Sequence, residues 1–484
     1  MFVLGLVAYS AETIIPAIEL AARESNQLYG SQVTFNHSVI GNPKSGDFCD
    51  QFQEAMTSQL AEFYYRRRSR SYFLLLPTGC SPSIVQAAGL AREWNVPVIS
   101  SGGGGDALRN KKLFPSLVCL LPSTVEEYTR TFFAIMQRNQ WHTVTFICNS
   151  DSSKNYFFRS ACQQFPAILK RQVVPFTVYD YENNLSQEYS RTSALKKARA
   201  QSRIIVILAH MDLVRLTLVT AFRLGMTNNN YVYLTSVWYN FNNPELGSPH
   251  WFRNDSLDTV ALEAFKSLLI ITLSSPRQSQ RLRDFFSAID SISRKNNVTV
   301  DYKAPNAIPK AEGQLYAIFA HAAFHAAAQM VNESIANGAD LNNGIDFAQR
   351  MYGRSYSSLE GHSFVVNANG DRDSLYAVLA ITTEQGDLQE ILLYDASKRD
   401  LYPSPSGHNW VRAESIPRDR PECGFHEDSS GCHADEYTTV LASTLVVVAI
   451  LLLVGITVLI KRYRNAAWRT CPYNLNSKDL VVRV

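Results

Sequence analysis

A long uncharged segment near the C-terminus constrains the structure of this chain more than any other feature. Residues 438–460 read TTVLASTLVVVAILLLVGITVLI, which is 23 residues without a charge. At a rise of ~1.5 Å per residue, such a helix extends about 34 Å and can cross a hydrocarbon layer of ~30 Å. Lys461, Arg462 and Arg464 follow directly, and the basic flank of a span stays in the cytoplasm. We predict a single-pass type I protein of the plasma membrane, with residues 1–437 outside and 461–484 inside.

The outer part has the sequence features of an extracellular protein. All of the eight cysteines except Cys471 lie there, where disulfides can form. The net charge of +3 gives no basis for binding nucleic acid. Candidate N-glycosylation sites are the five N-x-[ST] asparagines Asn36, Asn184, Asn254, Asn297 and Asn332.

The first ten residues, MFVLGLVAYS, contain a short apolar run without the basic start of a signal peptide. They fit a buried strand better than a signal peptide. We therefore expect the sequence to begin at the mature domain or to lack its first exon.

Short apolar strands alternate with helical patterns along the first half of the chain. Strands at 2–8, 72–76 and 96–100 are followed, after residue 120, by a second series at 144–148, 173–179, 204–209 and 231–236. Strands that are apolar on both faces and spaced by helices are typical of parallel sheets covered on both sides. Two such series predict two α/β lobes.

The pattern changes after residue 362. Strands with polar turns at 363–366, 375–382 and 388–394 indicate an antiparallel meander. Residues 400–437 are rich in Pro, Ser, Gly and Asp without periodicity, which predicts a linker to the membrane.

A run of four glycines, residues 102–105, follows the strand at 96–100. It lacks the G-x-x-x-x-G-K-[ST] motif, so we do not expect a nucleotide site. Glycines at the carboxyl end of a strand can still let a ligand approach the backbone. Ser100, Ser101 and Asp106 are therefore candidate ligand-binding residues, with an ordinary loop as the alternative.

Two histidines, His321 and His325, lie four residues apart in an apolar helical stretch. That spacing could present two metal ligands on one helix face. The sequence around them has no H-E-x-x-H motif and resembles a helix core, so we expect a structural role. We predict no metal, no organic cofactor and no catalytic residue.

Cys423 and Cys432 bracket a short segment just outside the membrane. A disulfide there would stabilise the stalk by roughly 2–3 kcal/mol on the chain-entropy model. Cys49 and Cys80 could form another pair.

Four segments together carry a recognisable pattern. They are PTGCSPSIVQAAGLAREWNVP at 77–97, MYGRSYSSLEGHSFVVNANGDRD at 351–373, IPRDRPECGFHEDSSGC at 416–432, and Ala467, Trp468 and Arg469 after the span. They resemble the G-P-G-C…W-x-V-P, M-x-x-R-x-F…G…D-x-x-G-D-R and I-P-x-C-G-F…C motifs and the cytoplasmic linker of receptor guanylate cyclases of the natriuretic-peptide receptor type. The resemblance covers nearly the whole chain.

The resemblance implies an α/β, two-lobed type I periplasmic-binding-protein-like fold with a single C-terminal transmembrane helix. It also implies disulfides Cys49–Cys80 and Cys423–Cys432. The backbone at Gly79 and Cys80 would correspond to the family's chloride site, with Ser45 or Asn42 nearby as a third ligand.

The family's next cysteine pair is not preserved in place, since Leu208 stands near one expected position. Cys148 and Cys162 form a candidate replacement pair, which leaves Cys119 unassigned.

The resemblance also bears on the ligand. Phe157 and Phe158 resemble an aromatic pair near the hormone groove of the family. Pro82 and Gly89, however, stand near the positions where hormone receptors carry a Tyr and an Arg. This departure favours an orphan or sensory cyclase of invertebrate type over a natriuretic-peptide receptor.

We expect an extracellular domain over 1–410, a stalk over 411–437 and a short tail after the span. The distal lobe would comprise about 1–112 and 270–345, and the proximal lobe about 113–269 and 346–410. A peptide or small molecule would bind in the cleft or at a homodimer interface.

Three functions remain open. The chain could be a receptor of guanylate cyclase type without its cyclase domain, a short-tailed receptor that clears its ligand, or an amino-acid-like sensor with Ser100 and Ser101 near the ligand.

Overall fold

The structure is a computed structural model. It describes residues 1–469 except for 8–10, 41–48, 69–70, 80, 123, 150–155, 173–175, 241–245, 297–309, 422–423 and 426–433. Its contacts divide the chain into two units, residues 1–419 and 420–484, which are described separately below.

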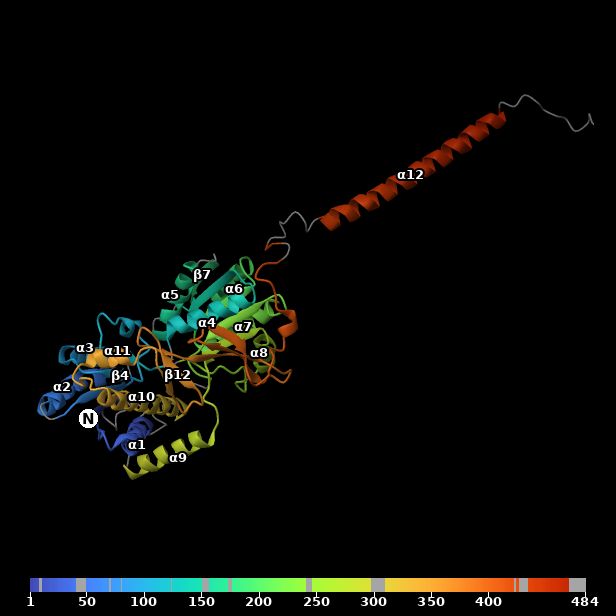
Figure 1. Ribbon diagram of the computed structural model, residues 1–484. Helices are drawn as coiled ribbons and strands as arrows, with labels where there is room; N and C mark the ends of the chain where they lie inside the picture. The colour runs from blue at the N-terminus through green and yellow to red at the C-terminus, as the bar shows by residue number, and fades with distance from the viewer. Residues whose placement is uncertain are drawn as a thin grey trace, which may run out of the picture. The chain divides into compact units, whose positions relative to one another are not determined.

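The N-terminal part of the first unit forms a five-stranded parallel sheet in the order β2-β1-β3-β4-β5 (Figure 1). Parallel strands need crossover connections, and helices supply most of them here. The strands are β1 (Phe2–Val7), β2 (Asn36–Ile40), β3 (Phe73–Thr78), β4 (Val98–Ser100) and β5 (Leu117–Cys119). The helices between them are α1 (Ala11–Tyr29), α2 (Cys49–Arg67), α3 (Ser81–Trp94) and the 3₁₀ turn η1 (Asp106–Arg109).

Three helices from much later in the chain pack onto this same region. They are α9 (Gln280–Lys295), α10 (Lys310–Ala336) and α11 (Gly344–Arg350). Helix α10 lies along α1 and also contacts β3 and β4. Because it is covered on both sides, its apolar side chains, such as Ala317 and Phe319, are fully buried.

The second sheet has eight strands in the order β16-β15-β14-β10-β9-β8-β6-β7. Pairing is parallel from β7 to β10 and antiparallel from β14 to β16, so the predicted meander over 375–394 is confirmed. The strands are β6 (Thr143–Asn149), β7 (Thr177–Asn183), β8 (Ile204–Leu208), β9 (Val232–Ser236), β10 (Leu268–Leu273), β14 (Leu375–Ile381), β15 (Leu388–Asp395) and β16 (Asp400–Pro403). The helices of this lobe are α4 (Val125–Arg138), α5 (Tyr156–Lys170), α6 (Glu188–Arg199), α7 (Met211–Arg223) and α8 (Asp258–Phe265).

A small antiparallel sheet lies where the chain returns from the first lobe to the second. It contains β11 (Ser355–Ser357), β12 (Ser363–Val366) and β13 (Arg372–Asp373). The predicted strand at 363–366 therefore belongs here and not to the meander. The chain passes between the two large sheets after β5, after β10 and again before β14. Two parallel-rich sheets joined in this way are the two-lobed type I periplasmic-binding-protein fold that we predicted.

The first part of the predicted linker is wrong, because residues 400–419 belong to the folded unit. Strand β16 pairs with β15, and the Trp410 indole donates to the Lys266 carbonyl over 2.8 Å. The Asp419 carboxylate accepts from the His142 and Thr143 amides at 2.7 and 2.6 Å. Neither the short edge strand β16 nor the hydrogen bonds of Asp419 produce a hydrophobic periodicity in the sequence. Composition alone therefore does not reveal them.

The second unit contains helix α12 (Ala434–Arg469). Within it, Leu441–Ala466 has a mean hydropathy of 2.9 and is not buried. It is the one helix among the described residues that is long and apolar enough to cross a membrane. A helix that is apolar on all sides and uncovered by protein is suited to a lipid surrounding.

A disulfide joins Cys148 at the end of β6 to Cys162 in α5, with their Cα atoms 5.9 Å apart. Cys119 is free and buried. The side chain of Cys49 and all of Cys80, Cys423 and Cys432 lie outside the described residues, so their predicted pairings stay predictions. Among the predicted glycosylation sites, Asn36 and Asn254 are exposed, Asn184 and Asn332 are half-buried, and Asn297 is not described.

Candidate functional site

Ser100 ends strand β4, Ser101 follows it, and both are buried. The Ser100 hydroxyl lies 2.8 Å from the Gly102 carbonyl and accepts from the Gly102 amide at 3.2 Å. Ser100 therefore holds the start of the glycine loop in place. Ser101 is 1% exposed, and its hydroxyl has no hydrogen-bond partner among the described residues.

The glycine loop packs directly onto the end of β3. A Cβ on Gly102 would lie 2.2 Å from the Gly79 amide nitrogen, and Gly103 has φ of +76°. The Gly105 amide donates to the Ser81 hydroxyl over 3.1 Å. The first two glycines thus serve close backbone packing and a left-handed turn, and they bring the Ser101 loop beside Gly79 of the predicted chloride site.

The other predicted site residues are spread over the two lobes. Phe158 lies in α5, is 2% exposed and packs into the main core, so its burial favours a structural role. The side chains of Phe157 and Asp106 are not described, and Cys80, Ser45 and Asn42 lie outside the described residues. The structure therefore places Gly79, Ser100 and Ser101 together in the first lobe and the phenylalanine pair on the second.

The three segments in which the chain crosses between the two large sheets, together with the small sheet β11–β13, are called the hinge below. A charged cluster at this hinge was not predicted. Asp371 Oδ1 accepts from Arg109 Nη1 at 2.8 Å and from Lys111 Nζ at 3.1 Å. The three side chains are only 10–15% exposed. Asn369 Nδ2 donates to the other carboxylate oxygen over 2.6 Å. Burial alone would raise the pKa of Asp371, but the charges of Arg109 and Lys111 hold it below its ordinary value.

This cluster joins the first crossing of the chain to the third. Cys119, the last residue of β5, donates its amide to the Gly370 carbonyl over 2.9 Å and forms a parallel bridge with Asp371. The Cys119 thiol lies 3.7 Å from Lys111 Nζ. The contacts of Asp371 therefore connect two chain segments that would have to bend if the two lobes opened.

A second buried ion pair lies beside the cluster. Arg372 and Glu360 are bonded to each other, with side chains 0% and 2% exposed. The Arg372 guanidinium stacks over Phe364 at 4.2 Å and approaches Phe319 of α10 at 5.7 Å. The Glu360 carbonyl accepts from the Arg277 amide, which follows β10. The small sheet thus contacts all three crossings.

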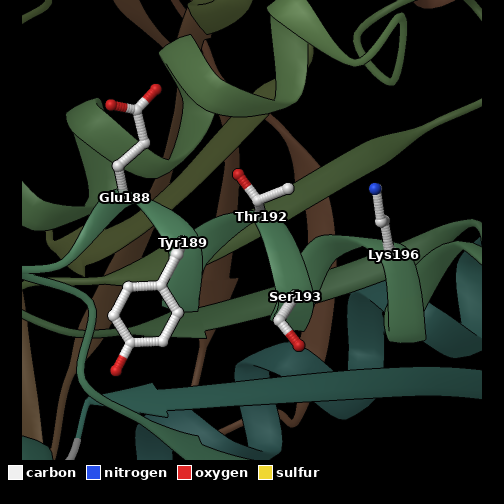
Figure 2. Close-up of a pocket in the computed structure, with 5 residues that line it drawn as sticks. All are labelled: Glu188, Tyr189, Thr192, Ser193 and Lys196. Atoms are coloured by element: carbon white, nitrogen blue, oxygen red, sulfur yellow. The ribbon is translucent and has the colours of Figure 1, made fainter.

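The hollow shown in Figure 2 lies elsewhere, on the outer face of α6. Its lining residues are Glu188, Tyr189, Thr192, Ser193 and Lys196. All belong to one helix, and Tyr189 is 75% exposed. A hollow that no second element closes lacks the convergent groups of a ligand pocket.

Comparison with known proteins agrees with this architecture. Residues 16–384 match the family model described as "Receptor family ligand binding region". The chain is 21% identical to bovine atrial natriuretic peptide receptor 3 over 395 residues, which cover 79% of this chain and 68% of that receptor. It is 24% identical to rat atrial natriuretic peptide receptor 2, covering 76% of this chain and 34% of that protein. It is also 28% identical to a receptor-type guanylate cyclase of Caenorhabditis elegans, over a segment that covers 49% of this chain and 18% of that cyclase.

Proposed function

Because the chain belongs to the family of receptor ligand-binding regions, we propose that it is a single-pass cell-surface receptor. One observation carries this proposal: the ligand-binding region at 16–384 and an apolar helix at Leu441–Ala466 occur in the same chain. Lys461, Arg462 and Arg464, which follow the helix, support an orientation with the two-lobed unit outside the cell. The ligand is an extracellular peptide or small molecule.

The hinge provides the mechanism by which a ligand would act. A ligand that contacts both lobes binds one relative position better than others and shifts the receptor towards it. Asp371 binds Arg109 and Lys111 and so connects the segments that would bend. The two lobes would therefore move as rigid bodies about this cluster. In a homodimer, this motion would change the separation of two copies of α12.

We place the chain with receptors of guanylate cyclase type, whose output is cGMP. The similarity to atrial natriuretic peptide receptor 2 and to the nematode cyclase supports this. The described residues contain no catalytic domain, so a cyclase output would come from sequence beyond them.

A receptor that clears its ligand by uptake is the second candidate. The similarity to bovine atrial natriuretic peptide receptor 3, at 21% identity over 395 residues, supports this alternative. On this alternative, the bound ligand enters the cell without a cGMP response.

The remaining features are proposed as parts of the same receptor. They are the distal and proximal lobe boundaries, the disulfides Cys49–Cys80 and Cys423–Cys432, and a chloride ion near Gly79. The resemblance to natriuretic-peptide receptors supports each of them.

The test uses the full chain with an N-terminal epitope tag behind a cleavable secretion signal. Antibody should label the tag on intact cells, and labelled atrial natriuretic peptide and free amino acids serve as the first probes. Saturable binding to this chain supports the receptor proposal, and uptake of the bound ligand by this chain alone supports clearance. The cyclase type predicts a rise in cGMP only from a product that carries a cyclase domain in addition to this chain. A tag that is reached only after permeabilisation would overturn the receptor topology.

A further inference from the structure

Three potential metal ligands converge where α1 packs against α10. Glu24 Oε2 of α1 lies 2.9 Å from His321 Nε2 and 2.8 Å from His325 Nε2 of α10. The three ligand atoms all lie within 4.8 Å of one another. Figure 1 shows α1, α9 and α10 side by side, in agreement with the contacts between α1 and both other helices.

The geometry fits a tetrahedral ion with little adjustment. Tetrahedral zinc holds its nitrogen and oxygen ligands at about 2.1 Å, which separates the ligands by about 3.4 Å from each other. The observed separations from Glu24 are about half an ångström shorter, so the carboxylate has to move outward. Glu24 is 40% exposed and ends a flexible side chain, which makes this movement easy.

The surroundings leave one coordination position open. His321 is 5% exposed and packs edge-on against Phe285 of α9, which fixes its ring. His325 and Glu24 are 23% and 40% exposed, so water can reach the ion from their side. Two imidazoles and one carboxylate with an open position are the ligands of many Zn²⁺ sites.

The charges also suit a cation. Glu24 supplies a carboxylate that lies within hydrogen-bond distance of both imidazole rings, and a transition-metal cation binds this set of donors. Arg281 of α9 brings a positive charge near His321, which opposes the binding of a cation.

We propose that Glu24, His321 and His325 form a site for Zn²⁺ or a similar transition-metal ion, with water as the fourth ligand. The ion ties α1 to α10, the longest helix of the first unit. Helix α10 also contacts β11 of the small antiparallel sheet. A bound metal ion would therefore stiffen the first lobe next to the hinge. The site is independent of the proposed receptor function.

Metal titration of the full chain tests the site. The untagged protein in detergent is stripped with chelator, dialysed and titrated with Co²⁺, whose visible absorption reports four-coordinate binding, and then with Zn²⁺ by calorimetry. We expect one Co²⁺ per chain, displaced by Zn²⁺. Glu24→Gln and His325→Gln should weaken metal binding by at least about 10–100-fold, because even residues that only hydrogen-bond to a metal ligand contribute that much to affinity.

The matched control is His408→Gln, which removes an exposed histidine elsewhere in the same unit. It should bind Co²⁺ as the original chain does. An unchanged melting temperature of each variant in chelator shows that the variant folds. If His325→Gln does not fold, Glu24→Gln alone tests the site. Absence of one-to-one binding, or equal affinity in Glu24→Gln and the control, would overturn the proposal and leave the trio as a hydrogen-bonded core contact.

Discussion

Arg109 Nη1 donates to Asp371 Oδ1 over 2.8 Å, although the two residues are 262 positions apart in the chain. Arg109 ends the 3₁₀ turn before β5, and Asp371 immediately precedes β13. Their bond therefore connects the first and third passages between the lobes. Lys111 binds the same oxygen, so one carboxylate is the shared partner of two largely buried cations.

Replacing Asp371 with Asn should strongly destabilise the first unit. The change keeps the shape but leaves Arg109 and Lys111 without a counter-charge, and removing one partner of a buried pair costs about 3–5 kcal/mol. Denaturant unfolding of the full chain in detergent, followed by tryptophan fluorescence, measures the loss.

The matched control is Asp180→Asn, whose partner Lys170 is 47% exposed while Asp180 itself is 52% exposed. An exposed pair contributes about 0–1 kcal/mol, so this variant should unfold almost as the original chain does. If both variants lose the same stability, the hinge cluster has no special role.

The sequence predicted both large sheets because their central strands are apolar runs of sufficient length. Strand β8, at Ile204–Leu208, coincides with the expected run at 204–209. Strands β5 and β13 have only three and two residues, too few for any periodicity, and they were missed. The spacing of His321 and His325 was noted in the sequence, but their contact with Glu24 was missed, as was the hinge cluster. In both cases the partners come from segments about 260–300 residues apart, and no local pattern connects them.

A methyl group on Gly102 should disrupt the Ser101 loop. The Cβ would stand 2.2 Å from the Gly79 backbone nitrogen, so either the loop or the end of β3 must move. We expect Gly102→Ala to cost at least about 2 kcal/mol, as strained core substitutions do. It should also weaken binding of any ligand that uses Ser101.

Gly89→Ala is the control for this change. Nothing lies within 4 Å of a Cβ at Gly89, which sits inside α3. An alanine in a helix interior is favoured over glycine by about 0.5–1 kcal/mol, so this variant should gain stability. The predicted effects have opposite signs, and thermal melting of both variants under one condition compares them directly.

The disulfide between Cys148 and Cys162 should contribute measurably to stability. It closes a loop with a sequence separation of 14, for which the chain-entropy model gives about 3 kcal/mol. Replacing both cysteines with alanine should lower the free energy of unfolding by that order. Peptide mapping without reduction should recover the two cysteines in one linked fragment, and recovery of both as free thiols would contradict the pairing.

Glu127 should make the stability of the first unit depend on pH near neutrality. Burial raises the pKa of this carboxyl, in the first turn of α4, to about 7 from an ordinary value of 4.5. Neighbouring Asp373 adds to the shift, while Arg130, at 3.5 Å, opposes it. Its Oε2 has no hydrogen-bond partner among the described residues. The folded state therefore favours the protonated form.

A folded-state pKa above the unfolded value means that the folded chain holds the extra proton between pH 4.5 and 7. The contribution of Glu127 to stability is therefore present below pH 4.5 and is lost as pH rises towards 7. Glu127→Gln cannot ionise, so relative to the original chain its stability should rise over this interval and level off above pH 7. The difference should approach about 3–4 kcal/mol at most, at 1.36 kcal/mol per pKa unit over the shift from 4.5 to about 7. Melting temperatures of both proteins between pH 4 and 8 measure this difference.

Glu126→Gln is the control. This variant should show no such trend, because the Glu126 carboxylate is 57% exposed. Parallel pH curves for Glu127→Gln and the original chain would show that Glu127 is ionised in the folded protein at neutral pH.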